Sequence, residues 1–412
     1  MRRRSFLGLA ATGALVPTAA RADARGGERW VTTWTSMPQL CEPHNMPPPP
    51  FTQDGLVLAD ATLRQTVKVT VGGQRMRLRF SNAFGGAALP ITAVTVALPA
   101  DGRAGVSAVQ PGTVRHVTFN GRTSATAPVG ALVLSDPLGF SLTPNTNLTV
   151  TVYLASGQAS NSITSHPGSR TTSHLLAGNH ADSPDLPGAT PTDHWYFLSA
   201  VEVRVDAAGV VVIGDSLTDG RGSTTNGNDR WPNQLFDRLR RNDIAVLNQA
   251  AGGNRVLNDG LGPSVLARLD RDLLAQSAVR WLILFEGVND IGTAAADETA
   301  QKQVTDDLIA AYQQIADRAH AHDIRVYGAT LLPFGGSGYD DPGGLRESSR
   351  QAVNRWIRTS HRFDAVVDFD AAVRDPADPR RLLAAADVGD HLHLNPTGYR
   401  MLAEAVPARL FR

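Results

Sequence analysis

The pattern of hydrophobic and polar positions changes about halfway along the chain. From about residue 28 to residue 205, short apolar runs alternate with polar positions at a period of two, and Gly, Pro, Asn and Ser separate them. No helical period appears in this half, so we expect an antiparallel β-sandwich with a jelly-roll-like topology. The pattern predicts strands at 30–36, 63–71, 75–80, 92–98, 114–119, 131–134, 147–154 and 195–205. The Gly72-Gly73 pair between the second and third of these is typical of a hairpin turn.

From Val210 to the end, strand and helix patterns alternate. Strands are predicted at 210–213, 244–248, 280–285, 324–330 and 365–369. Helical apolar spacing covers 231–240, 265–276, 298–322 and 345–360, and Asn395-Pro396 predicts a capped final helix over 397–410. Strands joined by helical crossovers imply a parallel sheet that is covered on both faces. We therefore predict two domains, an accessory β-sandwich over 25–205 and an α/β domain over 206–412.

The first 24 residues are predicted to be a signal peptide. Arginines at positions 2–4 precede Ser5-Phe6-Leu7 and a short apolar run that ends at Val16. Paired arginines at this place resemble a twin-arginine signal, and the alternative is an ordinary secretory signal. Both predict a bacterial protein that the export machinery delivers to the periplasm or the medium. No later segment is long and apolar enough for a stable membrane anchor.

Charge and cysteine content narrow the function further. The chain of 412 residues has 39 basic and 39 acidic side chains. Because no basic stripe is present, we expect no nucleic-acid partner. Cys41 is the only cysteine, so an intrachain disulfide is impossible. His391 and His393 alternate as metal ligands can, but no second cluster is spaced to join them, and we expect neither a metal nor a cofactor.

Four polar clusters follow strands of the predicted parallel sheet. They are GDSLTDG around Ser216, NQAAGGNR around Gly253, GVND around Asn289, and DHLH, which ends at His393. In a doubly wound sheet such loops open at the same end, so residues far apart in sequence are expected to converge there.

These residue types fit ester hydrolysis by a serine. A serine hydroxyl is a weak nucleophile that needs a base, and His393 is the candidate. Asp390 is placed to hold the other ring nitrogen and to stabilise the imidazolium that forms. Donors for the oxyanion are the backbone N–H groups of Ser216 and Gly253 and the side-chain amide of Asn289.

Several neighbouring residues are assigned supporting roles. Gly252 adjoins Gly253, and spacing to the Asn-Arg pair that follows favours Gly253 as the donor. Asp215 and Asp290 are expected to fix turns. For Trp231 the sequence leaves two positions open, the wall of the pocket and the core. The chain has no G-x-S-x-G, which argues against the α/β-hydrolase elbow.

In order, the four clusters resemble the blocks of the SGNH (GDSL) hydrolase superfamily. The resemblance covers roughly residues 208–410 and implies a flavodoxin-like, three-layer α/β fold with strand order 2-1-3-4-5. It also implies that Ser216, Gly253, Asn289 and His393 are the block residues, with Asp390 as the acid. Together with the N-terminal β-domain, the chain resembles exported SGNH esterases that remove O-acetyl groups from xylan and other plant polysaccharides.

Three functions therefore stand as hypotheses. The first is an exported serine esterase that hydrolyses acyl esters, with O-acetyl esters of plant cell-wall polysaccharide as substrate, through an acyl-enzyme. The second is a GDSL-type lipase or acyl-thioesterase with broad short-chain specificity. The third is a carbohydrate-binding protein whose hydrolase half is inert.

Overall fold

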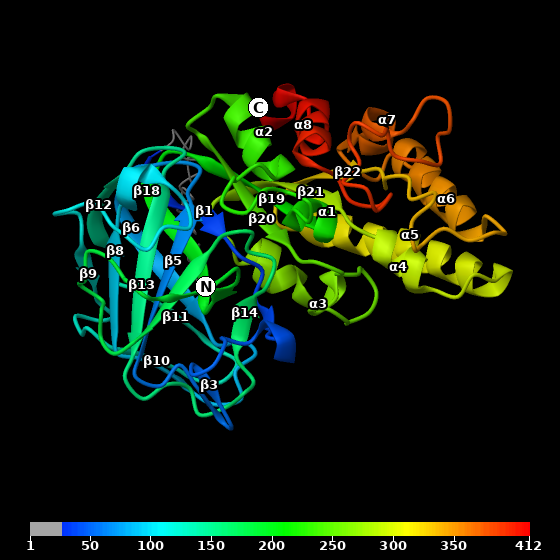
Figure 1. Ribbon diagram of the computed structural model, residues 1–412. Helices are drawn as coiled ribbons and strands as arrows, with labels where there is room; N and C mark the ends of the chain where they lie inside the picture. The colour runs from blue at the N-terminus through cyan, green and yellow to red at the C-terminus, as the bar shows by residue number, and fades with distance from the viewer. Residues whose placement is uncertain (1–26) are drawn as a thin grey trace, which may run out of the picture.

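The computed structural model describes residues 27–412, and Figure 1 shows two regions side by side. One is a β region, residues 29–205, and the other is an α/β region, residues 208–411. The predicted signal peptide lies outside the described residues. None of the helices in the described part of the chain has the length and apolar character needed to cross a bilayer.

Two antiparallel sheets form most of the β region, as the alternating pattern predicts. The first has the order β1 (Arg29–Thr35), β18 (Leu198–Val205), β6 (Gly73–Ser81) and β11 (Leu132–Leu134), with β12 (Leu138–Leu142) also paired to β6. The second has the order β16 (Thr190–Thr192), β15 (Ser173–Ala177), β5 (Ala61–Lys68), β13 (Asn147–Leu154), β8 (Ala93–Ala97) and β9 (Arg115–Val117). Each predicted strand segment contains a strand of the structure.

The hairpin predicted at Gly72-Gly73 is wrong. The strands on either side of it, β5 and β6, belong to opposite sheets, so the chain crosses between the sheets here. The crossing is tight, because a Cβ on Gly72 would lie 2.2 Å from the Leu142 carbonyl oxygen. A second difference is that the segment 195–205 is two strands, since Phe197 has a φ of 62° between them.

Smaller elements complete the β region. They are β2 (Gln39–Leu40), β3 (Thr52–Gln53), β4 (Leu56–Val57), β7 (Leu89–Ile91), β10 (Ala125–Ala127), β14 (Thr164–His166) and β17 (Trp195–Tyr196), with short turns η1 (Pro43–Asn45) and η2 (Ala100–Gly102). The three-stranded sheet β17-β14-β2 matters for function, because it carries His166 to the edge of the α/β region.

The α/β region contains a parallel sheet with the order β20 (Ile244–Ala250), β19 (Ala208–Gly214), β21 (Val279–Phe285), β22 (Arg325–Ala329) and β23 (Ala365–Val367). Numbered along the chain this is 2-1-3-4-5, which confirms the flavodoxin-like order. The helices are α1 (Ser216–Asp219), α2 (Trp231–Leu239), α3 (Val265–Leu269) with the π-helical turn η3 (Asp270–Leu274), α4 (Val288–Thr293), α5 (Glu298–His320), α6 (Leu345–Thr359), α7 (Phe369–Val373), α8 (Pro396–Ala405) and η4 (Ala408–Phe411). Helices α2 and α8 pack together on one face of the sheet, and α3 and α5 lie on the other (Figure 1).

Two element ends and one short helix differ from the sequence prediction for local reasons. The last strand stops at Val367, because the Asp368 side chain caps α7 by accepting a hydrogen bond from the Ala371 N–H. Helix α8 ends before Pro407, which cannot continue a helix. Helix α4 is too short for its period to be read from sequence.

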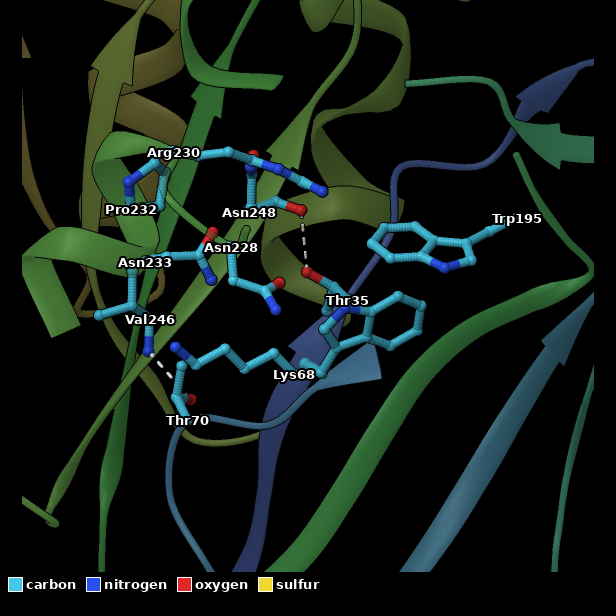
Figure 2. A pocket seen from close by; sticks show the side chains of 11 residues that line it. Thr35, Lys68, Thr70, Trp195, Asn228, Arg230, Pro232, Asn233, Val246 and Asn248 are labelled. Atoms are coloured by element: carbon cyan, nitrogen blue, oxygen red, sulfur yellow. Dashed lines mark hydrogen bonds between the residues drawn. The ribbon is translucent and has the colours of Figure 1, made fainter. Parts of the chain in front are cut away.

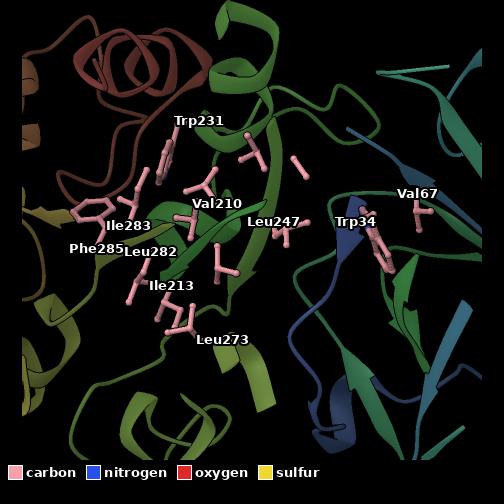
Figure 3. Packing of buried hydrophobic residues seen from close by; sticks show 14 of the residues in the cluster. Trp34, Val67, Val210, Ile213, Trp231, Leu247, Leu273, Leu282, Ile283 and Phe285 are labelled. Atoms are coloured by element: carbon pink, nitrogen blue, oxygen red, sulfur yellow. The ribbon is translucent and has the colours of Figure 1, made fainter. Parts of the chain in front are cut away.

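The hydrophobic core continues from one region into the other (Figure 3). Strand β1 lies against β20, the edge of the parallel sheet, and the Thr35 hydroxyl donates to the Asn248 carbonyl at 3.1 Å. The Thr32 N–H also donates to the Ser277 carbonyl at 3.3 Å. The two regions therefore share a packed, hydrogen-bonded interface, while the division of the chain into separately folding domains stays a prediction.

Candidate active site

The serine lies where strand β19 turns into a helix. Strand β19 is buried along its whole length and ends at Gly214. The Asp215 side chain accepts a hydrogen bond from the Leu217 N–H at 2.9 Å and so caps α1, as a turn-fixing role predicts. A Cβ on Gly214 would lie 2.4 Å from the Thr218 hydroxyl, so the turn needs glycine. Ser216 is thereby held in the first turn of α1, with 7% of its surface exposed.

Ser216, His393 and Asp390 form one hydrogen-bonded chain. The Ser216 Oγ lies 2.8 Å from His393 Nε2, and His393 Nδ1 lies 2.6 Å from Asp390 Oδ2. The other Asp390 oxygen accepts the backbone N–H groups of Leu392 and His393 at 3.1 and 2.8 Å. The loop before α8 thus fixes the carboxylate, and the carboxylate fixes the ring with Nε2 toward the serine.

The protonation states of His393 and Asp390 suit proton transfer from Ser216. Burial lowers the pKa of His393 and outweighs the opposite effect of Asp390, while Arg221 and Arg170 lower that pKa further. Partial burial opposes ionisation of Asp390, but the hydrogen bonds from the His393 backbone and ring lower its pKa to about 2. Near neutral pH this geometry therefore presents a neutral imidazole beside an ionised carboxylate.

The backbone of the loop after β20 supplies an N–H group near Ser216. The Gly252 N–H donates to Asp219 Oδ2 at 3.0 Å, so it is already engaged. Gly253 lines the same pocket as Ser216 and has a φ of 70°, a conformation that favours glycine. Of the two adjacent glycines, Gly253 is therefore the one placed to donate to an oxyanion, in agreement with the spacing argument.

Asn289, at the start of α4, is oriented on both sides of its amide. Its Nδ2 donates to the Asn254 carbonyl at 2.8 Å, and its Oδ1 accepts from the Tyr339 hydroxyl at 2.8 Å. An amide nitrogen carries two hydrogens, so one stays available toward the pocket. Tyr339 was not expected from sequence, because a single tyrosine in a loop after β22 has no distinguishing pattern.

Asp290 braces the loop that carries Gly253. Its two oxygens accept the Val256 and Leu257 N–H groups at 2.9 and 3.0 Å. This is the turn-fixing role that we predicted. Burial raises the pKa of Asp290 to about 6 and that of Asp215 to about 7.

The pocket over Ser216 is built by both regions and has a volume of about 420 Å³. The β region contributes Gln39, Glu42, His44, Asn45, Pro167, Gly168, Arg170 and His194. The α/β region contributes Ser216, Asp219, Arg221, Gly252, Gly253, Leu261, Asn289, Tyr339, Leu392 and His393. The five predicted site residues Ser216, Gly253, Asn289, Asp390 and His393 thus meet at one place, with Asp390 just behind His393.

A buried hydrogen bond between two side chains joins the β region to the floor of this pocket. His166 Nε2 lies 2.9 Å from Asp219 Oδ1, and His166 Nδ1 lies 3.1 Å from the Met37 carbonyl oxygen. His166 and Asp219 are 4% and 1% exposed. Since Asp219 Oδ2 also holds the Gly252 N–H, a histidine of the β region supports the loop that carries Gly253. Sequence could not reveal this pair, because nothing in the order of residues brings positions 166 and 219 together.

A second, smaller cavity lies at the interface of the two regions and does not contain the triad (Figure 2). Its volume of about 30 Å³ has room for a water molecule. Trp195 borders it and stacks on the His166 ring, with centroids 5.7 Å apart. The Arg230 guanidinium lies over the Trp195 ring, 5.5 Å from its centroid. The cavity therefore lies beside the tryptophan that stacks on His166, the partner of Asp219.

Two further predictions concern side chains outside the triad. Trp231 is fully buried, donates to the Thr218 hydroxyl at 3.1 Å and packs on Phe369, so it belongs to the core. His391 contacts Asp387 at 2.7 Å. Within residues 27–412, no three or more His, Cys, Asp or Glu side chains are grouped as metal ligands.

The chain is similar to known proteins over its second half. The model of the GDSL-like Lipase/Acylhydrolase family matches residues 212–401. A search of curated proteins finds no match to the sequence.

Solved structures are similar over the same half. A putative lipolytic protein of the G-D-S-L family from Desulfitobacterium hafniense is 21% identical over 49% of this chain and 99% of its own, with a TM-score of 0.37. An acetylxylan esterase from Geobacillus stearothermophilus is 21% identical over 48% of this chain and 91% of its own, with a TM-score of 0.37. A carbohydrate acetylesterase from Sinorhizobium meliloti is 16% identical over 49% of this chain and 97% of its own, with a TM-score of 0.38.

The family match confirms the resemblance inferred from the four sequence clusters. It spans β19 through most of α8 and includes Ser216, Gly253, Asn289 and His393. Residues 212–401 are therefore a GDSL-like lipase/acylhydrolase domain, and the protein is a carboxylic ester hydrolase.

Proposed function

We propose that the protein removes short acyl groups, above all acetyl, from carbohydrate esters through an acyl-enzyme on Ser216. The observation that carries the proposal is the continuous chain from Ser216 Oγ to His393 Nε2 at 2.8 Å and from His393 Nδ1 to Asp390 at 2.6 Å. This arrangement is what activation of a serine requires.

The proposed reaction has two halves. Ser216 Oγ attacks the ester carbonyl carbon as its proton passes to His393 Nε2, and Asp390 stabilises the imidazolium. The N–H groups of Ser216 and Gly253 and the Asn289 amide donate to the oxygen that becomes negative. When the C–O bond breaks, His393 returns the proton to the leaving alcohol and acetyl remains on the serine. A water molecule then attacks the acyl-enzyme carbonyl carbon as His393 takes its proton. His393 returns this proton to Ser216 Oγ as the bond between Oγ and the acyl carbon breaks, which releases the acid and restores the serine.

The pocket lining supports a polar substrate with a short acyl group. Its wall is mostly polar or charged, and Leu261 and Leu392 are its aliphatic members apart from Pro167. Hydroxyl-rich sugars match such a surface, whereas a long acyl chain needs an apolar groove. The lining therefore favours a carbohydrate esterase over the lipase alternative, and the intact triad geometry argues against an inert, purely carbohydrate-binding protein.

Two finer points of the proposal rest on sequence. Acetylated plant cell-wall polysaccharide such as xylan is the proposed natural substrate class. The proposed site of action is outside the cytoplasm, because the first 24 residues have the pattern of an export signal.

The test is an acetate-release screen over acetylated xylan, other acetylated glycans and aryl esters of increasing acyl length. Wild-type protein should release acetate from glycans and favour acetyl over long acyl esters. Ser216→Ala should fold and lose this activity, whereas Ser348→Ala, at an exposed serine of α6, should keep it. Equal turnover by the Ser216→Ala protein would refute the proposal, and a preference for long acyl chains would replace it with the lipase alternative.

A further inference from the structure

Two arginines line the active-site pocket without a partner of their own. Arg170 follows β14 in the β region, and Arg221 follows α1. Over residues 27–412 neither guanidinium makes a hydrogen bond or an ion pair, and the Arg170 Nε is a buried atom with no hydrogen-bond acceptor. Leaving a buried charged donor unsatisfied costs free energy, so we expect this donor to have a function, such as binding an acceptor on a ligand.

The carboxylates of the pocket wall do not neutralise these arginines. Glu42 accepts hydrogen bonds from Gln39 and Asn45 at 2.7 and 2.9 Å. Asp219 is held by His166 and by the Gly252 N–H. Each acidic group therefore has donors already, as Asp390 has in His393.

The arginines also lie among other cationic groups. Burial and the nearby Arg170 charge lower the pKa of Arg230 to about 10, against the attraction of Asp219. Arg221 and Arg170 both contribute to the lowered pKa of His393. His44 and His194 line the same pocket, and burial lowers the pKa of His194. An anion bound here would relieve this repulsion between like charges.

We infer that the pocket binds a carboxylate of the substrate, with Arg170 and Arg221 as its recognition residues, so that the preferred substrate is an acetyl ester of an acidic sugar such as a uronic acid. This inference rests on the proposed function and names its substrate class. A guanidinium presents donors in a planar fork that matches a carboxylate, and the half-buried Arg170 and the exposed Arg221 offer such forks from the β region and the α/β region. The carboxylate is assigned to the sugar and not to the acyl group, because the wall that carries Arg170 also offers Gln39 and Asn45 for sugar hydroxyls.

The inference has a consequence for the catalytic base. A carboxylate between the arginines offsets their effect on His393 and raises the pKa of the ring in the enzyme–substrate complex. The acidic limb of the kcat profile should therefore lie at higher pH with a charged substrate than with a neutral one. Arg170→Gln should reduce this difference.

The experiment compares two substrates that differ by one group, mono-O-acetyl methyl glucuronoside and mono-O-acetyl methyl glucoside. We expect wild-type kcat/KM to favour the glucuronoside by about 10-fold or more, the range of one hydrogen bond to a charged group. Arg170→Gln and Arg221→Gln should each reduce this ratio several-fold. Arg75→Gln removes the same charge from an exposed residue of β6 outside the pocket and should leave the ratio at its wild-type value.

Three results would overturn the inference. The first is a wild-type ratio near one, and the second is an equal loss of kcat/KM on both substrates in the arginine variants. The third is a preference for negative charge that appears only when the charge is on the acyl group, as in a hemisuccinate ester of methyl glucoside. Binding of methyl glucuronoside and methyl glucoside to the Ser216→Ala protein, measured by calorimetry, is the arm that needs no turnover. Tighter binding of the glucuronoside, lost in the Ser216→Ala, Arg170→Gln double variant, supports the carboxylate site even if no acetyl ester is hydrolysed. Turnover without charge discrimination supports the esterase and refutes the carboxylate site.

Discussion

Asp219→Asn tests whether the β region supports the oxyanion site through His166. One Asp219 oxygen accepts from His166 Nε2 at 2.9 Å and the other from the Gly252 N–H at 3.0 Å. An asparagine has one acceptor oxygen, so its NH₂ group would face one of these two donors. If the oxygen keeps His166, the Gly252 N–H loses its acceptor and the neighbouring Gly253 N–H is no longer held in place.

The magnitude follows from two contributions. A hydrogen bond to a charged group is worth about 1.5–3 kcal/mol, and that bounds the loss of unfolding free energy. Complete loss of an oxyanion donor costs about 2.7–4 kcal/mol of barrier, and a loosened Gly253 N–H should cost a part of this. We therefore expect kcat to fall about 10- to 100-fold, which is about 1.4–2.7 kcal/mol, with KM changed less than about threefold.

The assay is steady-state hydrolysis of para-nitrophenyl acetate together with urea unfolding of the same preparations. Asp243→Asn is the matched control, because Asp243 pairs with Arg241 at the surface and its side chain is 52% exposed. That control should change stability by no more than about 1 kcal/mol and leave kcat at the wild-type value. A folded Asp219→Asn protein with kcat within twofold of wild type would refute the supporting role.

Three further predictions concern the base, the amide donor and the buried acid under the site. Activity should rise with pH as His393 loses its proton, with a midpoint below about 6.5 because burial lowers the pKa of His393. Asp390→Asn should reduce kcat by about 10³–10⁴ and move this midpoint lower still. A wild-type midpoint above about 6.5 in a pH–rate profile would contradict the reasoning. Tyr339→Phe should reduce kcat about fivefold with little change in KM, because one hydrogen bond of about 1 kcal/mol no longer orients Asn289; an unchanged kcat would show that the amide is held without it. The pKa of Asp215 is raised from 3.8 to about 7 by burial, so its contribution to stability is complete below about pH 4 and is lost as pH rises toward 7. Asp215→Asn should flatten urea-unfolding free energies between about pH 4 and 7 by up to about 4 kcal/mol, and an unchanged slope would contradict the shift.

Much of the α/β region could be predicted from the sequence, because its signals are local. Strand β19 is a continuous apolar run that ends at a glycine, and helix α5 has many turns over which its apolar period repeats. Ser216, Asn289 and His393 each follow such an element, so the order of the elements was enough to place them at one edge of the sheet.

The missed features depend on contacts between distant segments. Gly72-Gly73 has the composition of a hairpin turn, but which sheet each neighbouring strand joins is decided by packing across the whole sandwich. His166 and Tyr339 carry no local pattern, and their roles appear only when Asp219 and Asn289 are found opposite them. The short strands and helices were missed for a related reason, since a few residues do not show a period.

Trapping of the acyl-enzyme tests the central claim most directly. Wild-type protein mixed with para-nitrophenyl acetate, quenched in acid within the first turnover and digested, should carry one acetyl group on the peptide that contains Ser216, as mass spectrometry would show. Ser216→Ala protein treated in the same way should carry none and should show no burst of nitrophenol. An acetyl group found reproducibly on another residue, or a full burst from the Ser216→Ala protein, would contradict the account.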